Sequence, residues 1–132
     1  MNILVTGGNG FLGSNIVKKL TKENHNVLKI SKLNNFSEHF KEIESFCPDI
    51  VILFGWGGGS NDKFVRSLNQ FYDNIPDYLI LLEFICNLPK RPKFIGIGSF
   101  AEYGDSLIQM SDCDREYPVS LYGLSKLVFK QY

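Results

Sequence analysis

The residues best suited to proton transfer in this chain are Tyr122 and Lys126, in the segment Tyr122-Gly123-Leu124-Ser125-Lys126. On a helix, side chains four positions apart share one face. A tyrosine hydroxyl ordinarily titrates near pH ~10, and an ammonium group beside it favours the phenolate. The pair therefore suits general acid–base chemistry near neutral pH. The same spacing also arises by chance, with a core tyrosine and a surface lysine.

A second candidate site is the glycine-rich segment Thr6-Gly7-Gly8-Asn9-Gly10-Phe11-Leu12-Gly13. Gly7 would allow a tight turn, Gly10 would leave room for a pyrophosphate, and Gly13 would let a helix pack closely on a sheet. The free N–H groups and the dipole of a helix N-terminus favour anions. The spacing therefore predicts dinucleotide binding, with a turn that serves only packing as the alternative.

The elements that would position these residues alternate along the chain. Apolar runs predict buried strands, and apolar residues at helical spacing predict amphipathic helices. Pro76 must start, kink or interrupt the third of these helices. The expected strands are 3–5, 27–30, 49–54 and 93–98, and the expected helices are 11–22, 37–46, 62–88 and 120–132.

Strands that alternate with helices indicate βαβ units, a parallel sheet and right-handed crossovers. The sequence thus predicts an α/β fold: a Rossmann-type, doubly wound parallel sheet in three α/β/α layers. About four strands are expected, so the sheet looks truncated. We expect residues 1–132 to form one NAD(P)-binding domain.

The glycine segment, its strand–loop–helix context and the Tyr122–Lys126 pair together resemble the extended short-chain dehydrogenases/reductases. TGGNGFLG is similar to the TGxxGxxG fingerprint of the NAD-dependent epimerases and dehydratases that modify sugar nucleotides, and Tyr122 to Lys126 matches their YxxxK motif. The resemblance implies a longer protein with a C-terminal substrate domain. That domain is missing here, so we interpret the chain as a fragment.

The resemblance also implies site residues. Ser99, in Gly98-Ser99-Phe100-Ala101-Glu102-Tyr103-Gly104, falls on the catalytic Ser/Thr position, although Gly98 stands where Ser or Thr is usual. Ser99 and Tyr103 would contact the substrate. The implied catalytic residues are Ser99, Tyr122 and Lys126. The implied cofactor-binding residues are Gly7, Gly10, Phe11, Leu12, Gly13, Ser31, Lys32, Phe54, Gly55, Trp56, Asn74, Tyr122 and Lys126. The segment around Asn74 matches only in part, since Asp77 and Tyr78 replace the family's Gly and Thr.

The resemblance places Ser31 where many NAD-dependent enzymes carry an acidic residue that binds the adenosine ribose. Ser31 and Lys32 suit the 2′-phosphate of NADP better than a carboxylate would, so we favour NADP over NAD. Alternatively, these two residues form only a solvated strand end.

The function implied is an NAD(P)-dependent oxidoreductase acting on a nucleotide-activated sugar. Epimerase and 4-ketoreductase remain open. Dehydration is less favoured, because Phe100 and Ala101 occupy the positions where a dehydratase has an acidic pair. The alternative is a non-catalytic module that binds a dinucleotide or a protein partner through the same fold.

The composition of the chain disfavours several other classes of protein. The formal net charge is zero, which disfavours binding to nucleic acids or membranes. Hydrophobic residues make up 44%, as is ordinary for a globular protein. No apolar run is long enough to span a bilayer, and no basic leader precedes the first strand. Cys47, Cys86 and Cys113 are expected to be free thiols in a reducing cytoplasm, with no metal site. The resemblance also implies a possible homodimer, since extended relatives often dimerise through helices that include the YxxxK helix.

Overall fold

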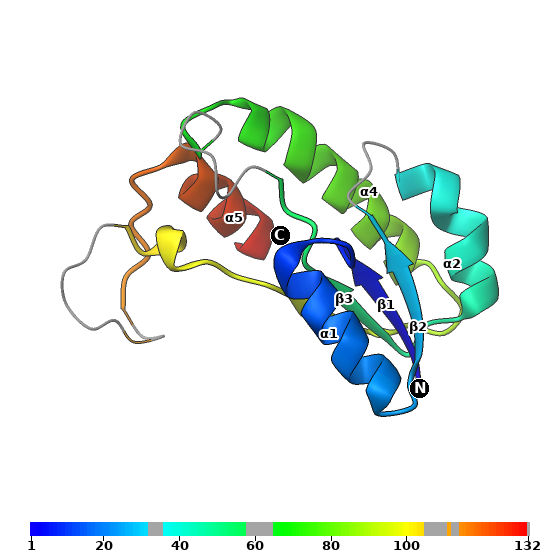
Figure 1. The fold of residues 1–132 in the computed structure, drawn as a ribbon. Helices are drawn as coiled ribbons and strands as arrows, with labels where there is room; N and C mark the ends of the chain where they lie inside the picture. The colour runs from blue at the N-terminus through cyan, green and yellow to red at the C-terminus, as the bar shows by residue number, and fades with distance from the viewer. Residues whose placement is uncertain (32–35, 58–64, 105–110, 112–113, 132) are drawn as a thin grey trace. The chain divides into compact units, whose positions relative to one another are not determined.

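The computed structural model spans residues 1–132 and describes residues 1–31, 36–57, 65–104, 111 and 114–131 (Figure 1). The chain forms two compact units. One comprises residues 1–56 and 76–97, and the other comprises residues 57–75 and 98–132. The first unit contains the sheet and the glycine loop. The second contains Ser99, Tyr122 and Lys126.

The first unit is built on a four-stranded parallel sheet with the strand order β2-β1-β3-β4. Its strands are β1 (Asn2–Thr6), β2 (Asn26–Ile30), β3 (Ile50–Leu53) and β4 (Lys93–Gly96). The chain runs outward from β1 to β2, then returns past β1 to β3. The order therefore reverses between β1 and β3, and in open α/β sheets ligands bind at the carboxyl ends of the strands at such a point.

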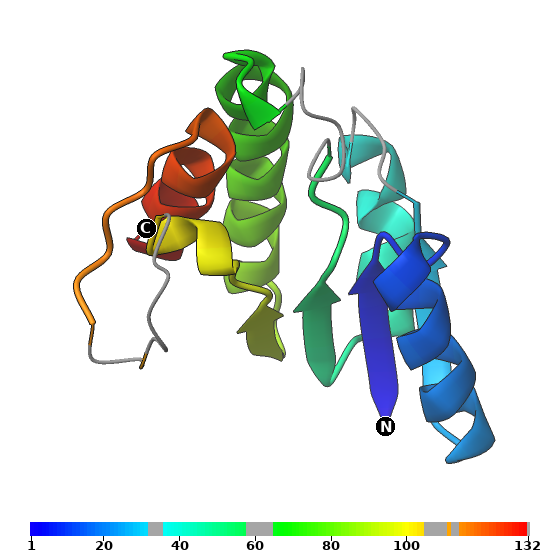
Figure 2. The ribbon, with the colours of Figure 1, turned by 60° about the vertical axis from the view of Figure 1, so that its left-hand side comes forward.

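Helices cover both faces of this sheet (Figures 1 and 2). Helix α1 (Phe11–Lys22) packs against β1 and β2 on one face, and α2 (Phe40–Phe46) and α4 (Ile75–Cys86) lie on the other. The Phe40 ring of α2 stacks on the Phe84 ring of α4, with centroids 3.9 Å apart. These layers confirm the predicted Rossmann-type α/β fold.

The core of this unit lies around the central strands. Ile3, Leu4 and Val5 of β1 are at most 2% exposed, and Val51 of β3 is fully buried. A parallel strand flanked by neighbours and covered on both faces needs a continuous apolar run, because neither row of side chains meets water. This requirement explains why short runs of Ile, Leu and Val sufficed to predict these strands.

The predicted helix over 62–88 is the expectation that differs most from the structure. Residues 58–64 lie outside the described residues, and the regular helix α4 begins only at Ile75, after the π-helical turn η2 (Gln70–Asn74). Pro76 has no N–H group for the helical ladder, so the wider turn directly before it relieves the mismatch. Helix α4 ends at Cys86, before Pro89.

Smaller differences occur at other boundaries. The predicted helix 37–46 begins as the 3-10 turn η1 (Phe36–His39) before α2. Strand β3 ends at Leu53 and β4 ends at Gly96, each earlier than predicted. The chain leaves β4 for the turn that carries Ser99, which ends the ladder there.

The second unit contains the short 3-10 helix η3 (Phe100–Glu102), helix α5 (Leu121–Gln131) and the turn η2. Helix α5 contacts both η3 and η2. The predicted helix 120–132 is thus confirmed over Leu121–Gln131, and Tyr132 lies outside the described residues. Within the described part of the chain, no helix has the length and apolar character needed to cross a membrane.

Candidate functional site

The glycine loop turns sharply away from β1 at Gly7. This residue has φ +65°, in the left-handed region that favours glycine. Its N–H donates to the carbonyl of Ile30 at 2.7 Å, which ties the loop to the end of β2. A Cβ atom at Gly7 would lie 2.5 Å from the Cα of Gly55. Gly7 is therefore required by both its backbone conformation and the loop that follows β3.

Gly13 and Gly10 differ in what surrounds them. A Cβ at Gly13 would lie 2.2 Å from the carbonyl oxygen of Gly7, so this residue lets α1 pack directly on the loop. A Cβ at Gly10 would meet only that same oxygen, at 3.2 Å, and Gly10 is exposed. Packing thus requires glycine at 13 far more strictly than at 10, where the missing side chain leaves an open surface.

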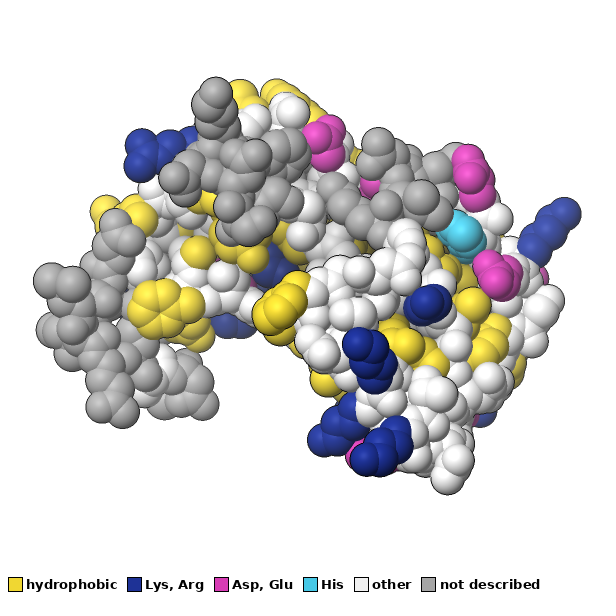
Figure 3. Space-filling view, viewed as in Figure 1, with side chains coloured by type: hydrophobic (Ala, Val, Ile, Leu, Met, Phe, Trp, Pro, Cys, Tyr) yellow, Lys and Arg dark blue, Asp and Glu magenta, His cyan; other side chains and the backbone are white. Residues whose placement is uncertain are grey.

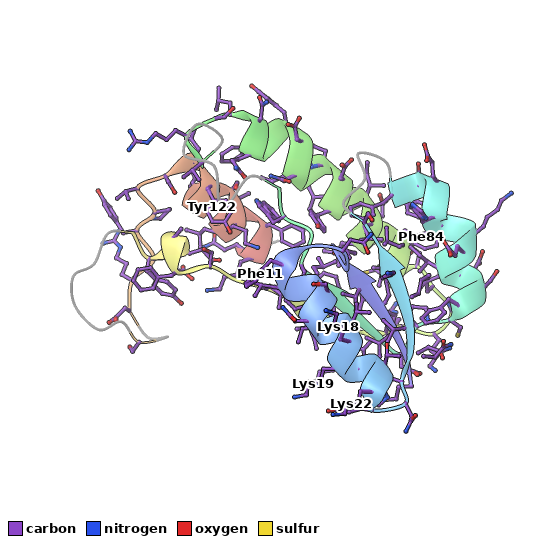
Figure 4. The ribbon with its side chains drawn as sticks, viewed as in Figure 1. Phe11, Lys18, Lys19, Lys22, Phe84 and Tyr122 are labelled. Atoms are coloured by element: carbon purple, nitrogen blue, oxygen red, sulfur yellow. The ribbon has the colours of Figure 1, made fainter. Side chains whose placement is uncertain are left out.

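Helix α1 begins at Phe11, directly after the glycine loop. Gly10 is the N-cap, no side chain caps the helix, and its first turn has no acidic residue. Lys and Arg side chains gather over the C-terminal part of α1 in Figure 3, and Figure 4 labels Lys18, Lys19 and Lys22 there. Cations stabilise a helix C-terminus and anions its N-terminus. The free N–H groups at the N-terminus of α1 are therefore well suited to a bound anion.

Apolar side chains flank this helix start. Phe11 is 85% exposed and Leu12 is 58% exposed. Both were predicted to bind the cofactor. Their exposure leaves them accessible to a ligand, while Gly13 behind them is buried.

The predicted cofactor-selecting position, Ser31, directly follows the last residue of β2. Its hydroxyl accepts a hydrogen bond from the Asn9 amide at 2.5 Å. Asn9, which sequence reasoning did not single out, therefore joins the glycine loop to the end of β2. Lys32 lies outside the described residues.

The loop after β3 lies against the glycine loop. Gly55 is buried, and the Trp56 ring stacks on Tyr78 of α4 with centroids 5.3 Å apart and planes 7° apart. A Cβ at Gly55 would lie 2.6 Å from the Tyr78 hydroxyl oxygen. Burial raises the pKa of Tyr78 well above its ordinary value, so this hydroxyl stays neutral. Tyr78, which departs from the family pattern, thus supports the loop that carries Phe54, Gly55 and Trp56.

Asn74, another predicted cofactor residue, lies in the second unit and is fully buried. Its side-chain oxygen accepts from the Gly57 N–H at 3.0 Å. Its amide nitrogen donates to the Gly57 carbonyl at 3.3 Å and to Gln70 at 3.0 Å. The side chain is thus occupied in holding the backbone of Gly57. Gln70 was not predicted, and only its spacing on the turn with Asn74 could have indicated it.

Ser99 lies at the N-cap of η3, in the second unit. Its hydroxyl accepts from the Ala101 N–H at 3.3 Å, while the Glu102 carboxylate accepts from the Ser99 N–H at 2.6 Å. This reciprocal arrangement is a capping box. Two neighbours therefore fix Ser99, and among the described residues its hydroxyl group acts only as an acceptor. Ser99 and Glu102 stand three positions apart, the spacing by which a capping box is recognised in a sequence.

Helix α5 carries Tyr122 and Lys126. Ser120 accepts from the Gly123 N–H at 3.0 Å at the start of the helix, and Tyr122 is half-buried in the first turn (Figure 4). A Cβ at Gly123 would lie 2.0 Å from the Ala101 carbonyl oxygen. The glycine within the YxxxK motif therefore lets α5 pack directly on η3, the turn that Ser99 caps.

Lys126 is 8% exposed. Desolvation lowers the pKa of its ammonium to about 8, and the negative charge of Glu102 partly opposes this effect. Lys126 therefore loses its positive charge at a lower pH than an ordinary lysine does.

Tyr103 and Gly104 follow η3. Gly104 has φ +87°, and a Cβ there would lie 2.3 Å from the Tyr117 carbonyl oxygen, so only glycine fits. Tyr103 is half-buried, and the Lys130 Nζ lies 5.5 Å from the centre of its ring. The predicted substrate role of Tyr103 stays a prediction.

The described residues contain no group of three or more His, Cys, Asp or Glu side chains that could hold a metal ion. The first unit contains a helix N-terminus suited to an anion, at the start of α1. The second unit contains Ser99, Tyr122 and Lys126, and the pKa of Lys126 is lowered.

The parallel sheet, its order reversal and the glycine loop at that point define the class: a Rossmann-type α/β protein. The family model described as "NAD dependent epimerase/dehydratase family" matches residues 3–132. The chain belongs to this family, as its motifs suggested.

Solved structures agree on the fold. UDP-glucose 4-epimerase from Thermotoga maritima, solved with UDP-glucose, is 25% identical with a TM-score of 0.87, and the match covers 100% of this chain and 50% of that one. The Thermus thermophilus UDP-glucose 4-epimerase complex with NAD is 23% identical with a TM-score of 0.88, covering 100% and 49%. The UDP-Glc/GlcNAc 4-epimerase of Campylobacter jejuni is 20% identical with a TM-score of 0.86, covering 98% and 47%. The chain thus spans about half the length of these proteins.

Proposed function

We propose that this chain binds a nicotinamide dinucleotide at the glycine loop. We further propose that it supplies acid–base groups for an oxidoreductase reaction on a nucleotide-activated sugar, of epimerase or 4-ketoreductase type. The observation that carries the proposal is the start of α1. Its N-cap is Gly10, an exposed glycine that packing does not strictly require, and the first turn has neither a side-chain cap nor an acidic residue.

The residues of the loop fit such a ligand. A pyrophosphate needs N–H donors and close approach to the backbone, and Gly10 leaves that approach open. The cofactor residues proposed around it are Gly7, Phe11, Leu12, Gly13, Ser31, Lys32, Phe54, Gly55, Trp56, Asn74, Tyr122 and Lys126. Asn74 would act through Gly57, since its side-chain amide already binds that backbone.

The dinucleotide, when bound, would accept and donate hydride. The residues of this chain would handle the proton and orient the sugar. Tyr122 would take the proton from the sugar hydroxyl, and Lys126 as the ammonium would favour the phenolate form. The Ser99 hydroxyl would donate to the sugar oxygen that becomes a carbonyl.

The substrate class rests on the family and on similar structures. The T. maritima relative was solved with UDP-glucose. A nucleotide-linked sugar is therefore the proposed substrate here, and Tyr103 the residue proposed to contact it with Ser99.

For the cofactor we propose NADP over NAD, because no carboxylate stands at position 31. Ser31 lies at the end of β2, joined to the glycine loop through Asn9. The similar T. thermophilus protein was solved with NAD, so the two cofactors must be compared directly.

The test is a titration of the purified chain with NADPH and with NADH, followed by nicotinamide fluorescence. Tighter binding of NADPH would support Ser31 and Lys32 as the selector and favour a reductase. Tighter binding of NADH would rule out that selector and favour an epimerase.

Two further outcomes bear on the function itself. Absence of binding by both cofactors would contradict the glycine-loop proposal. Binding without turnover of any UDP-sugar would favour the alternative, a non-catalytic dinucleotide-binding module.

A further inference from the structure

A buried carboxylate that the proposed chemistry does not use lies beside the catalytic residues. Glu102, in η3, is 2% exposed. An isolated buried carboxylate is costly, so such groups are paired or hydrogen-bonded. The partners of Glu102 therefore indicate its role.

The first partner is the backbone of Ser99, whose N–H donates to the Glu102 Oε1 at 2.6 Å. Together with the reciprocal bond from the Ala101 N–H to the Ser99 hydroxyl, it fixes the turn. Charge-assisted hydrogen bonds are stronger than neutral ones. The orientation of Ser99 therefore depends on the charge and the reach of Glu102.

The other partners are cations on α5. Lys126 and Glu102 are both buried, 8% and 2% exposed, on α5 and η3, two elements that pack together at Gly123. The negative charge of Glu102 opposes the effect of burial on the pKa of Lys126. The Lys130 Nζ lies 3.7 Å from the Glu102 Oε2. Tyr122, Lys126 and Lys130 recur every four residues, so they lie along one face of α5.

Gly98 accounts for the space that Glu102 needs. A Cβ at position 98 would lie 3.3 Å from the Glu102 Oε1. The serine or threonine that the family resemblance leads one to expect at that position would crowd the carboxylate. The Gly98 departure and the buried Glu102 are therefore two parts of one local arrangement.

We propose that Glu102 is a positioning residue of this site, whose buried carboxylate fixes the Ser99 backbone and holds Lys126 in its cationic form. The inference rests on the proposed function for its catalytic meaning. In this arrangement the Glu102 carboxylate connects Ser99, the proposed hydroxyl donor, to Lys126, the lysine proposed to lower the pKa of Tyr122.

The charged and titratable groups around Glu102 decide how the test is read. Lys126 and Lys130 face it from α5. Lys130 also binds the Glu116 carboxylate at 2.7 Å and lies over the Tyr103 ring. The hydrogen bond to Glu116 raises the pKa of Lys130. The pKa of Lys130 is therefore raised, whereas the pKa of Lys126 is lowered to about 8, so the two titrations can be told apart.

The experiment is an NMR titration of the lysine side chains in the full chain, without cofactor, in wild type and Glu102→Gln. Removing the negative charge should move the Lys126 titration to lower pH, because burial then acts unopposed. Glu116→Gln is the matched control: it removes an equal charge from the same network, and should leave the Lys126 titration in place. An unchanged midpoint in Glu102→Gln would overturn the proposal.

A second measurement needs no variant and covers the case in which Glu102→Gln fails to fold. In the wild-type chain, the Ser99 amide resonance should titrate with the same midpoint as Lys126, because Glu102 couples the two groups. A Ser99 amide that stays constant while Lys126 titrates would overturn the coupling.

Enzyme activity is the third measurement, and it distinguishes failure of the Glu102 proposal from failure of the proposed oxidoreductase function. In turnover of a nucleotide sugar, the loss of rate at alkaline pH should begin at lower pH in Glu102→Gln than in Glu116→Gln. If no dinucleotide binds while the lysine titrations behave as expected, the proposed function fails and the electrostatic role of Glu102 stands. Binding and turnover with identical pH profiles in both variants would contradict the role of Glu102 alone.

Discussion

At the scale of single residues, the glycines of the loop have different reasons to be glycine. Gly7 has a left-handed backbone and meets Gly55, and Gly13 meets the Gly7 carbonyl. Gly10 has an ordinary φ of −75° and more room. The motif thus combines two residues fixed by packing with one whose proposed reason is a ligand.

Substitution of Gly10 by aspartate separates stability from binding. Asp is a better N-cap than glycine by a few tenths of a kcal/mol, so the melting temperature should hold or rise slightly. Its negative charge would occupy the space of the pyrophosphate, and NAD(P)H binding should weaken by at least roughly tenfold, about 1.4 kcal/mol. Calorimetry and fluorescence titration measure the two effects.

Gly10→Asn is the matched control, since it caps the helix with a side chain of the same shape and no charge. It should bind the cofactor more tightly than Gly10→Asp. Unaltered affinity in Gly10→Asp would show that no phosphate lies against this residue.

At the scale of elements, close backbone contact positions helix α5, which carries the proposed acid–base residues Tyr122 and Lys126. Helix α5 approaches η3 at Gly123, and Ser120 and Ser99 cap the two elements. The turn η2 before Pro76 is also held by a contact distant in sequence, because the Asn74 side chain in that turn hydrogen-bonds the backbone of Gly57.

Gly123→Ala tests the contact between α5 and η3. In an exposed helix, alanine stabilises by about 1 kcal/mol relative to glycine. Here the added Cβ would lie 2.0 Å from the Ala101 carbonyl oxygen. We therefore expect net destabilisation of about 1–3 kcal/mol, the range for overpacking. Urea unfolding measures it.

The neighbouring Leu124→Ala provides the control. Leu124 is 39% exposed on the same helix, so its truncation should cost less than Gly123→Ala. A more stable Gly123→Ala protein would mean that α5 does not pack on η3 at this residue.

At the scale of the whole molecule, the strands of the parallel sheet differ in how deeply they are buried. Strand β1 pairs on both sides, whereas β4 pairs with β3 alone among the described strands. Leu4 and Val5 are fully buried, while Ile95 of β4 is 36% exposed.

Hydrogen exchange should reflect this difference in burial. Backbone amides of β1 should exchange the slowest in the first unit, because opening them requires the sheet to separate on both sides. Amides of β4 should exchange faster. NMR-detected exchange compares the amides of the two strands. Faster exchange in β1 than in β4 would contradict the strand order.

Much of this protein follows from local sequence. Short apolar runs predicted the four strands. For the central strand β1 the reason is burial on both faces, which requires continuous hydrophobicity, whereas β2 and β4 are partly exposed. Helix α1 was predicted with its observed bounds. The glycine and YxxxK spacings identified the family. Each of these signals lies within a few consecutive residues, where the spacing along the sequence fixes the local backbone geometry.

Other features depended on residues far apart in the chain. Gly7 meets Gly55, Tyr78 supports Trp56, and Glu102 unites Ser99 with two lysines of α5. A sequence lists these residues without their distances, and only the folded arrangement of the chain decides which carboxylate meets which ammonium. The sequence by itself determined the fold class and the family. Only the tertiary structure decided that Glu102 is buried and that Lys126 has a pKa of about 8, because desolvation arises when the chain packs.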